Sequence, residues 1–234
     1  MRTIGIIPVR MGSSRFPGKP LALIHGRPMI RWVFESAQRA RSIYPLFVAT
    51  PDKEIIDYCE REHLPHIVTA FSCRSGTERV FNALRQIGQH EDEDIVMNIQ
   101  GDEPTIRPES LDLLAHAFAD PKIQIASLFY RAAERQGEAD PNRVKVILTK
   151  SRDAFAFTRK AVRREIDHGI HVGIYAYRRV VLSRIMGIIP SDDLEQIAWL
   201  RAGFDIRMIE IDYAPKSVDV LADLALAERL LVHA

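Results

Sequence analysis

Cysteine, long hydrophobic runs and an excess of one charge are all scarce or missing in this 234-residue chain. Its two cysteines, Cys59 and Cys73, have neither the number nor the spacing of a disulfide framework or a metal site, which fits a reducing cytosol. No apolar run approaches the length that spans a membrane, and the N-terminus has no signal-peptide pattern. We therefore expect a soluble, cytoplasmic protein.

The charges nearly cancel, because the formal net charge is only +1. This balance gives no electrostatic case for nucleic acid or an anionic membrane as a partner. Two phosphate-binding fingerprints, G-x-x-x-x-G-K-[ST] and G-x-G-x-x-G, are also missing, which disfavours an ATPase P-loop and a dinucleotide fold. The hydrophobic share of 47% supports a sizeable core, and with no long linker we expect one domain over residues 1–234.

A basic, glycine-rich loop follows the first hydrophobic run. Residues 4–8 (IGIIP) are typical of a central parallel strand that is covered on both faces. Cations and unobstructed backbone N–H groups at the carboxyl end of a strand suit a polyphosphate. Composition alone leaves a solvated basic loop as an equal alternative. The loop holds Arg10, Arg15 and Lys19, with Gly12, Ser13, Ser14 and Gly18 between them.

Helical and strand patterns alternate through the first half of the chain, which favours an α/β fold. We expect helices at 28–40, 52–62 with Asp52 as cap, and from 75 with Thr77 as an available cap. Further strands are expected at 46–49, 66–69, 95–99, 123–130, 144–148, 154–158, 173–177 and 206–211, and further helices at 111–118, 180–186, 194–202 and 221–232. The architecture is thus a three-layer α/β/α sandwich whose mixed, mostly parallel sheet has a small antiparallel excursion.

A second polar cluster follows the strand at 95–99, where the sequence reads Gln100, Gly101, Asp102, Glu103, Pro104. Ligands of open α/β sheets gather at the carboxyl ends of the strands, so Arg10, Lys19 and Asp102 are expected to face one crevice. Mg²⁺ prefers carboxylate oxygens together with substrate phosphates. A capping or turn aspartate is the alternative for Asp102.

Three segments in this order resemble the signatures of the cytidylyltransferases that activate 3-deoxy-manno-octulosonate (Kdo): IPVRMGSSRFPGKPL, SGTER and NIQGDEP. The resemblance covers nearly the whole chain and is strongest over residues 1–150. It implies the nucleotide-diphospho-sugar transferase type of fold, with a nucleotide half at about 1–120 and an acceptor-binding and dimerisation half at about 121–234 of a homodimer. The nucleotide-binding residues it implies are Pro8, Arg10, Gly12, Ser13, Arg15, Lys19, Ser75, Gly76, Thr77 and Arg79, of which Arg10, Arg15 and Lys19 hold the triphosphate of CTP.

The resemblance also implies Mg²⁺ bound by Asp102 and by a second carboxylate before the last helix. The family has a valine-aspartate-threonine-proline step there, and Asp219 falls on its aspartate. Val220 replaces the threonine and the proline is replaced too. Asp223, or a simple helix cap at Asp219, is the alternative.

Three later segments, residues 157–159, 171–178 and 194–196, resemble the part of the family that holds the sugar acid. Taken alone, His171 and Tyr175 would be structural residues. The connection from Arg159 to His171 is shorter than in the family and lacks its proline-tryptophan step, and the segment between Pro190 and Leu194 is shortened as well. The acceptor is therefore open between Kdo, another ulosonic acid and a phosphonate. The implied acceptor-binding residues are Gln100, Arg159, His171, Tyr175, Glu195 and Gln196.

The function implied by the resemblance is transfer of CMP from CTP to a 2-keto-3-deoxy sugar acid, with release of pyrophosphate. The product would serve lipopolysaccharide, capsule or a small-molecule pathway. A metal-dependent glycosyltransferase is one alternative, but it would carry Asp-x-Asp where this chain reads Gly101, Asp102, Glu103. A catalytically silent nucleotide-binding subunit is the other.

Overall fold

The computed structural model describes residues 2–13, 15–88, 91–92, 94–132, 140, 142–188 and 194–231. Ser14 of the basic loop and the shortened segment at 189–193 lie outside the described residues. Among the described helices, none combines the length and the apolar composition needed to cross a membrane.

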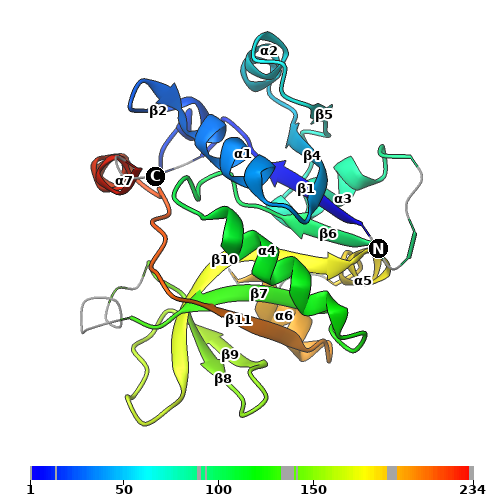
Figure 1. Ribbon diagram of the computed structural model, residues 1–234, viewed down its shortest axis with the longest axis vertical. Helices are drawn as coiled ribbons and strands as arrows, with labels where there is room; N and C mark the ends of the chain where they lie inside the picture. The colour runs from blue at the N-terminus through cyan, green and yellow to red at the C-terminus, as the bar shows by residue number, and fades with distance from the viewer. Residues whose placement is uncertain are drawn as a thin grey trace.

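A mixed sheet runs through the molecule, as the sequence predicts (Figure 1). Its continuous path has the order β11-β7-β10-β6-β1-β4-β5, in which β10 is antiparallel to both neighbours and every other pair is parallel. A hairpin of β8 and β9 pairs with the start of β10 and forms the antiparallel excursion. The strands are β1 (Thr3–Pro8), β4 (Ile43–Thr50), β5 (His66–Val68), β6 (Ile95–Asn98), β7 (Ile125–Tyr130), β8 (Lys145–Leu148), β9 (Ala154–Thr158), β10 (His168–Arg178) and β11 (Ile206–Ile211).

Two hydrophobic cores lie on opposite faces of this sheet and make the three layers. Successive side chains of β1 alternate between them: Ile7 packs in the core beneath α1, α2 and α4, whereas Ile4 and Ile6 pack in the core beneath α3, α5 and α6. The helices are α1 (Met29–Arg39), α2 (Lys53–Arg61), α3 (Gly76–Leu84), α4 (Pro108–His116), α5 (Arg179–Ile185) and α6 (Glu195–Arg201).

The last helix, α7 (Leu224–Leu231), packs against a small hairpin of β2 (Leu23–Ile24) and β3 (Arg27–Pro28). A third cluster around Ile24, Met29 and Val218 joins them. The sequence reading missed this hairpin, because two-residue strands are too short to show any periodicity. Short 3₁₀ turns occur at Lys19–Leu21, Ala117–Ala119 and Leu221–Asp223.

Of the two predicted helix caps, Asp52 occupies the N-cap position of α2 without a side-chain capping bond, and Thr77 is not the cap of α3. Asp52 precedes α2 but makes no capping bond; its Oδ2 instead accepts a hydrogen bond from the backbone N–H of Met11 at 2.7 Å. Asp52 therefore anchors the loop that follows β1. Thr77 lies inside α3, and the cap is Ser75, whose hydroxyl accepts from the backbone N–H of Glu78 at 3.1 Å.

Candidate active site

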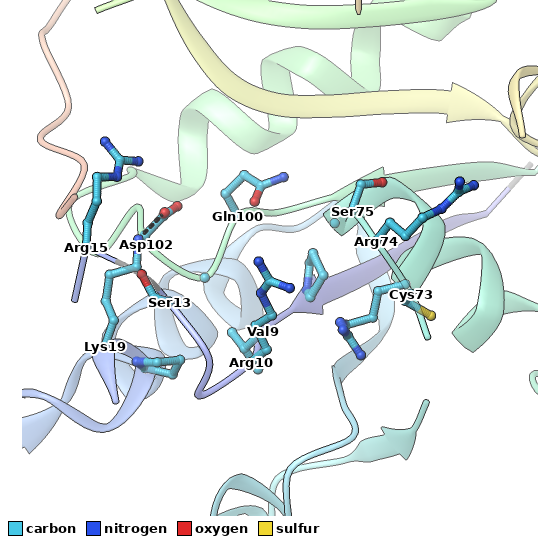
Figure 2. Close-up of a pocket in the computed structure, with 15 residues that line it drawn as sticks. Val9, Arg10, Ser13, Arg15, Lys19, Cys73, Arg74, Ser75, Gln100 and Asp102 are labelled. Carbon is cyan, nitrogen blue, oxygen red and sulfur yellow. Dashed lines mark hydrogen bonds and ion pairs between the residues drawn. The ribbon is translucent and has the colours of Figure 1, made fainter. Parts of the chain in front are cut away.

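The loop after β1 and the start of α3 line one cavity of about 280 Å³. Figure 2 shows Arg15, Asp102 and Lys19 at one end of it and Cys73, Arg74 and Ser75 at the other. The loop is held by a backbone bond from the Gly18 N–H to the Met11 carbonyl at 3.0 Å, and Gly18 has the positive φ of 74° that favours glycine. Most predicted nucleotide-binding residues meet here: Pro8, Arg10, Ser13, Arg15, Lys19, Ser75, Gly76 and Arg79.

The remaining two of the predicted set lie elsewhere. Gly12 belongs to the same loop but is not among the residues that line the cavity, and Thr77 lines the neighbouring acceptor-side cavity instead. Cys73 and Arg74 line the nucleotide-side cavity although the sequence reading did not select them. Their position immediately before the SGTER segment is the signal that could have found them.

Two ion pairs bring the loop cations to the predicted metal carboxylates. The Lys19 Nζ lies 2.6 Å from Asp102 Oδ2, and an Arg15 guanidinium nitrogen lies 2.8 Å from Asp219 Oδ1. The backbone N–H of Val218 also donates to the Asp102 carbonyl at 2.9 Å. This last bond joins the end of β6 to the segment that carries Asp219, so both carboxylates belong to one site.

Arg10 differs from the other two loop cations. Within the described part of the chain, its side chain has no hydrogen-bond or ion-pair partner, although it lines the cavity. Its charge also lowers the pKa of the Arg79 guanidinium, adding to the larger effect of burial. Arg10 is therefore a guanidinium whose donors remain available to a phosphate.

The turn before α3 presents backbone and a buried arginine to the cavity. A side chain at Gly76 would meet the Gln100 amide nitrogen at 3.2 Å, so glycine keeps this approach open. Arg79 is buried and donates to the Thr69 hydroxyl at 2.7 Å and to the Ala70 carbonyl at 3.4 Å. These bonds fix its side chain against the end of β5.

Glu103 is a third carboxyl group beside the two aspartates. It is only 7% exposed, and its Oε2 has no hydrogen-bond partner within the described residues. Burial, followed by the charges of Asp102 and Asp219, raises the pKa of Glu103 well above its usual range. The acid pair of the sequence thus divides into Asp102, which is held in an ion pair with Lys19, and Glu103, whose burial favours its protonated form.

The donor set of this site suits Mg²⁺. Within the described residues there is no group of three or more histidine, cysteine, aspartate or glutamate side chains that could hold a metal by themselves. Two carboxylates that leave further positions to phosphate oxygens are nevertheless the arrangement that Mg²⁺ prefers. Asp102 and Asp219 fit it because both line the cavity on the acceptor side of the cations.

Asp223 has a different role from Asp219. Its Oδ2 accepts from the backbone N–H groups of Asp219 at 2.8 Å and Val220 at 3.0 Å, and its Oδ1 lies 2.6 Å from the Lys216 Nζ. Burial acts to raise the pKa of Asp223, but the Lys216 bond and the two backbone bonds lower it overall. Asp223 is therefore occupied as a cap, which favours Asp219 as the carboxylate that faces the site.

An adjoining cavity of about 500 Å³ shares Arg15, Gln100 and Asp102 with the first. Strand β10, the segment 142–144 before β8, the start of α6 and residues of the segment 215–223 enclose it. It brings together every residue predicted for the sugar acid, namely Gln100, Arg159, His171, Tyr175, Glu195 and Gln196.

The aromatic wall of this second cavity is uncharged. Burial lowers the pKa of His171 to about 3 and raises that of Tyr175 well above its usual range. The Ser127 hydroxyl donates to the Ile174 carbonyl at 2.7 Å and lies 2.9 Å from His171 Nε2. Because the serine proton is thus engaged, Nε2 carries the imidazole proton and Nδ1 is left as an acceptor for a ligand hydroxyl.

Comparison with known proteins gives one consistent family. The family profile described as "Cytidylyltransferase" matches residues 4–214. The 3-deoxy-manno-octulosonate cytidylyltransferase of Acidobacterium capsulatum is 35% identical over 100% of this chain and 98% of its own. That of Rhodopseudomonas palustris is 37% identical over 99% and 98%.

Solved structures with a similar fold include a member of the same family. A CMP:2-keto-3-deoxy-manno-octonic acid synthetase complexed with CTP has a TM-score of 0.90 at 33% identity, covering 100% of this chain and 99% of its own. A 4-diphosphocytidyl-2C-methyl-D-erythritol synthase from Anaerococcus prevotii has a TM-score of 0.68 at 12% identity over 99% of each chain. The latter likeness is one of fold.

Proposed function

Because the chain belongs to the cytidylyltransferase family, we propose that it transfers CMP from CTP to a 2-keto-3-deoxy sugar acid, Kdo or a close relative, and releases pyrophosphate. One observation carries the proposal. The cation-lined cavity and the cavity with the predicted acid-binding residues meet at Arg15, Gln100 and Asp102. A donor nucleotide and an acceptor can therefore be held side by side, with the reacting atoms at this junction.

The chain's own residues act by positioning and by charge. Arg10, Arg15 and Lys19 bind the triphosphate and neutralise the charge that develops on the departing pyrophosphate. The turn at Ser75 and Gly76 receives the cytosine end of the nucleotide. Asp102 and Asp219 would hold Mg²⁺, which when bound supplies charge neutralisation at the phosphates and lowers the pKa of a nearby hydroxyl.

The anomeric hydroxyl of the acceptor attacks the α-phosphate of CTP, a new oxygen–phosphorus bond forms, the bond to pyrophosphate breaks, and the hydroxyl proton passes to solvent. With a pKa of about 3, His171 is neutral, so we assign it to orienting an acceptor hydroxyl through Nδ1. Gln100 lies at the junction and can contact both substrates. Glu195 and Gln196, at the start of α6, complete the acceptor wall.

The experiment is an activity assay with CTP, Mg²⁺ and a panel of acids: Kdo, other ulosonic acids and phosphonates. Pyrophosphate release and the mass of the CMP conjugate are followed together. We expect release with Kdo or a close relative. If pyrophosphate is released only with another acid, that acid is the acceptor. If no acid leads to pyrophosphate release, a non-catalytic nucleotide-binding subunit is favoured.

We also propose a cytoplasmic homodimer. The buried, unpaired thiols of Cys59 and Cys73 are compatible with a reducing compartment. The β8–β9 hairpin presents Phe155 to solvent with 71% of its surface exposed, which suits a contact with a second copy of the chain.

A further inference from the structure

We propose that Arg143, at the base of β8, is a specificity-determining residue that binds a carboxylate of the acceptor. The inference rests on the proposed function and narrows its substrate class to acceptors that present a carboxylate to this end of the cavity. Arg143 is absent from the set implied by the sequence motifs, yet it lines the acceptor cavity together with Arg159.

The position of Arg143 is defined by its neighbours. One guanidinium nitrogen donates to the Tyr130 hydroxyl at 2.8 Å, and Nε lies 3.6 Å from Asp140 Oδ2. The ion pair is long, and the side chain retains 37% of its exposure. A guanidinium has five N–H donors, so most of them remain for a ligand.

A buried lysine lies behind this arginine. Lys145 is 0% exposed, and its Nζ donates to two backbone carbonyls, those of Asp140 at 2.6 Å and Arg159 at 3.1 Å. Burial lowers the pKa of Lys145, Asp140 acts to raise it, and Arg159 and Arg143 lower it further. Lys145 thus connects the segment before β8, which carries Arg143, to the end of β9, where Arg159 lies. It also adds a third positive charge beside the two arginines.

Positively charged side chains gather at this end of the cavity. Within the described residues, Lys145 interacts electrostatically with Arg143 and Arg159 and with the carboxylate of Asp140. Of the other described acids that line the cavity, Asp102, Asp219 and Asp223 are paired with Lys19, Arg15 and Lys216. Glu103 and Glu195 lie after β6 and at the start of α6. A concentration of positive charge next to a low-dielectric wall attracts an anion.

A carboxylate is the anion that fits. Arginine recognises carboxylates by paired N–H···O bonds, and the acceptor class proposed above carries such a group. Neutral Tyr130, His171 and Tyr175 add hydrogen bonds and apolar surface but no charge, so the discrimination between an acid and a neutral sugar falls to the arginines. Arg159 is held by a bond to the Asn142 carbonyl at 3.1 Å, next to Arg143 in the chain.

The test compares two enzymes, each with a charged and an uncharged acceptor. Arg143→Gln and wild type are assayed with Kdo and with its C1 amide, and KM is measured separately for acceptor and CTP. We expect Arg143→Gln to raise KM for Kdo about 10- to 100-fold, with kcat and KM for CTP within about threefold. The amide should be equally poor with both enzymes, and Arg143→Lys should restore part of the acid preference.

The matched control is Arg152→Gln, which removes an arginine that pairs with Glu210 outside the cavity, and it should leave every parameter unchanged. If Arg143→Gln weakens acid and amide by the same factor, or changes neither, the inference is overturned. Wild type that is inactive with all sugar acids would count against the proposed function instead. Calorimetric titration of Kdo then decides the inference alone, because equal affinities of wild type and Arg143→Gln, or no binding to either, would also overturn it.

Discussion

At the scale of single residues, two of the three loop cations already have carboxylate partners. Lys19 and Arg15 each hold one of the two aspartates, whereas Arg10 has no partner within the described residues. The pairs keep the side chains extended into the junction, and a phosphate can exchange with a carboxylate as the partner of each cation. These residues therefore give separable predictions for nucleotide binding and for metal binding.

Lys19→Met should lower kcat/KM for CTP about 10²- to 10³-fold, because a preorganised donor to developing phosphate charge is lost. Pyrophosphate release at saturating acceptor measures it. The control is Lys53→Met, which removes a lysine that is 82% exposed, pairs with Asp57 within α2 and does not line the cavity. A Lys19→Met enzyme with wild-type kinetics would remove Lys19 from the triphosphate site.

Asp219→Asn should mainly change activity, whereas Asp223→Asn should mainly change stability. We expect Asp219→Asn to lower kcat about 10²-fold and to raise the Mg²⁺ concentration needed for half-maximal rate. Asp223→Asn should instead lower the free energy of unfolding by about 1 kcal/mol, because it weakens the cap at Asp219 and Val220 and the Lys216 pair. Magnesium titrations and urea denaturation of both variants decide between them, and the reverse pattern would assign the metal to Asp223.

At the scale of elements, the carboxyl ends of β1 and β6 place the two motif loops side by side, because these strands are adjacent and parallel. The sequence pattern of strands and loops predicted this placement of the two loops. Strand β10 was predicted only from residue 173, but it begins at His168, because its first residues pair with β8. This longer strand carries both His171 and Tyr175 into the acceptor cavity.

The partly buried imidazole of His171 in β10 makes stability depend on pH. His171 has a pKa of about 3 in the fold against 6.5 for a free histidine, so below pH 6.5 the unfolded chain binds a proton that the folded chain does not. The free energy of unfolding should therefore fall as the pH drops from 6.5 towards 3, by up to about 1.4 kcal/mol per pH unit from this group.

His171→Gln should remove this contribution, so that urea unfolding between pH 6.5 and 4 becomes less steeply pH-dependent than in wild type. Above pH 6.5 the two proteins should differ by a constant amount. An unchanged slope in the variant would mean that His171 becomes protonated in the folded protein.

At the scale of the whole molecule, the junction of two cavities arises from the order of the sheet. The loops after β1 and β6 carry the cations and Asp102, while β10 and the residues that flank the β8–β9 hairpin carry the acceptor wall. In Figure 1 the hairpin projects at the end of the sheet opposite α2 and β5. That projecting position makes it the expected contact of the proposed homodimer.

Phe155→Ser should weaken the homodimer, raising its dissociation constant on the order of 10- to 100-fold, because a largely exposed phenylalanine would lose its buried contact area. Light scattering across a dilution series measures the change. The matched control is Phe71→Ser, since Phe71 is 77% exposed but follows β5, outside the hairpin. Wild type that remains monomeric at all concentrations, or an equal effect of both substitutions, would contradict the proposal.

The sequence by itself determined what depends on neighbouring residues: the buried strands, the amphipathic helices, the basic loop and the motifs that place the chain in its family. The tertiary structure decided the pairs between distant residues, such as Lys19 with Asp102, 83 positions apart, and Arg15 with Asp219, 204 apart. It also decided the burial of Glu103 and Lys145 and the use of Asp52 and Asp223 as anchors. Periodicity and strand ends are local properties, whereas partners and burial depend on which surfaces the sheet order brings together.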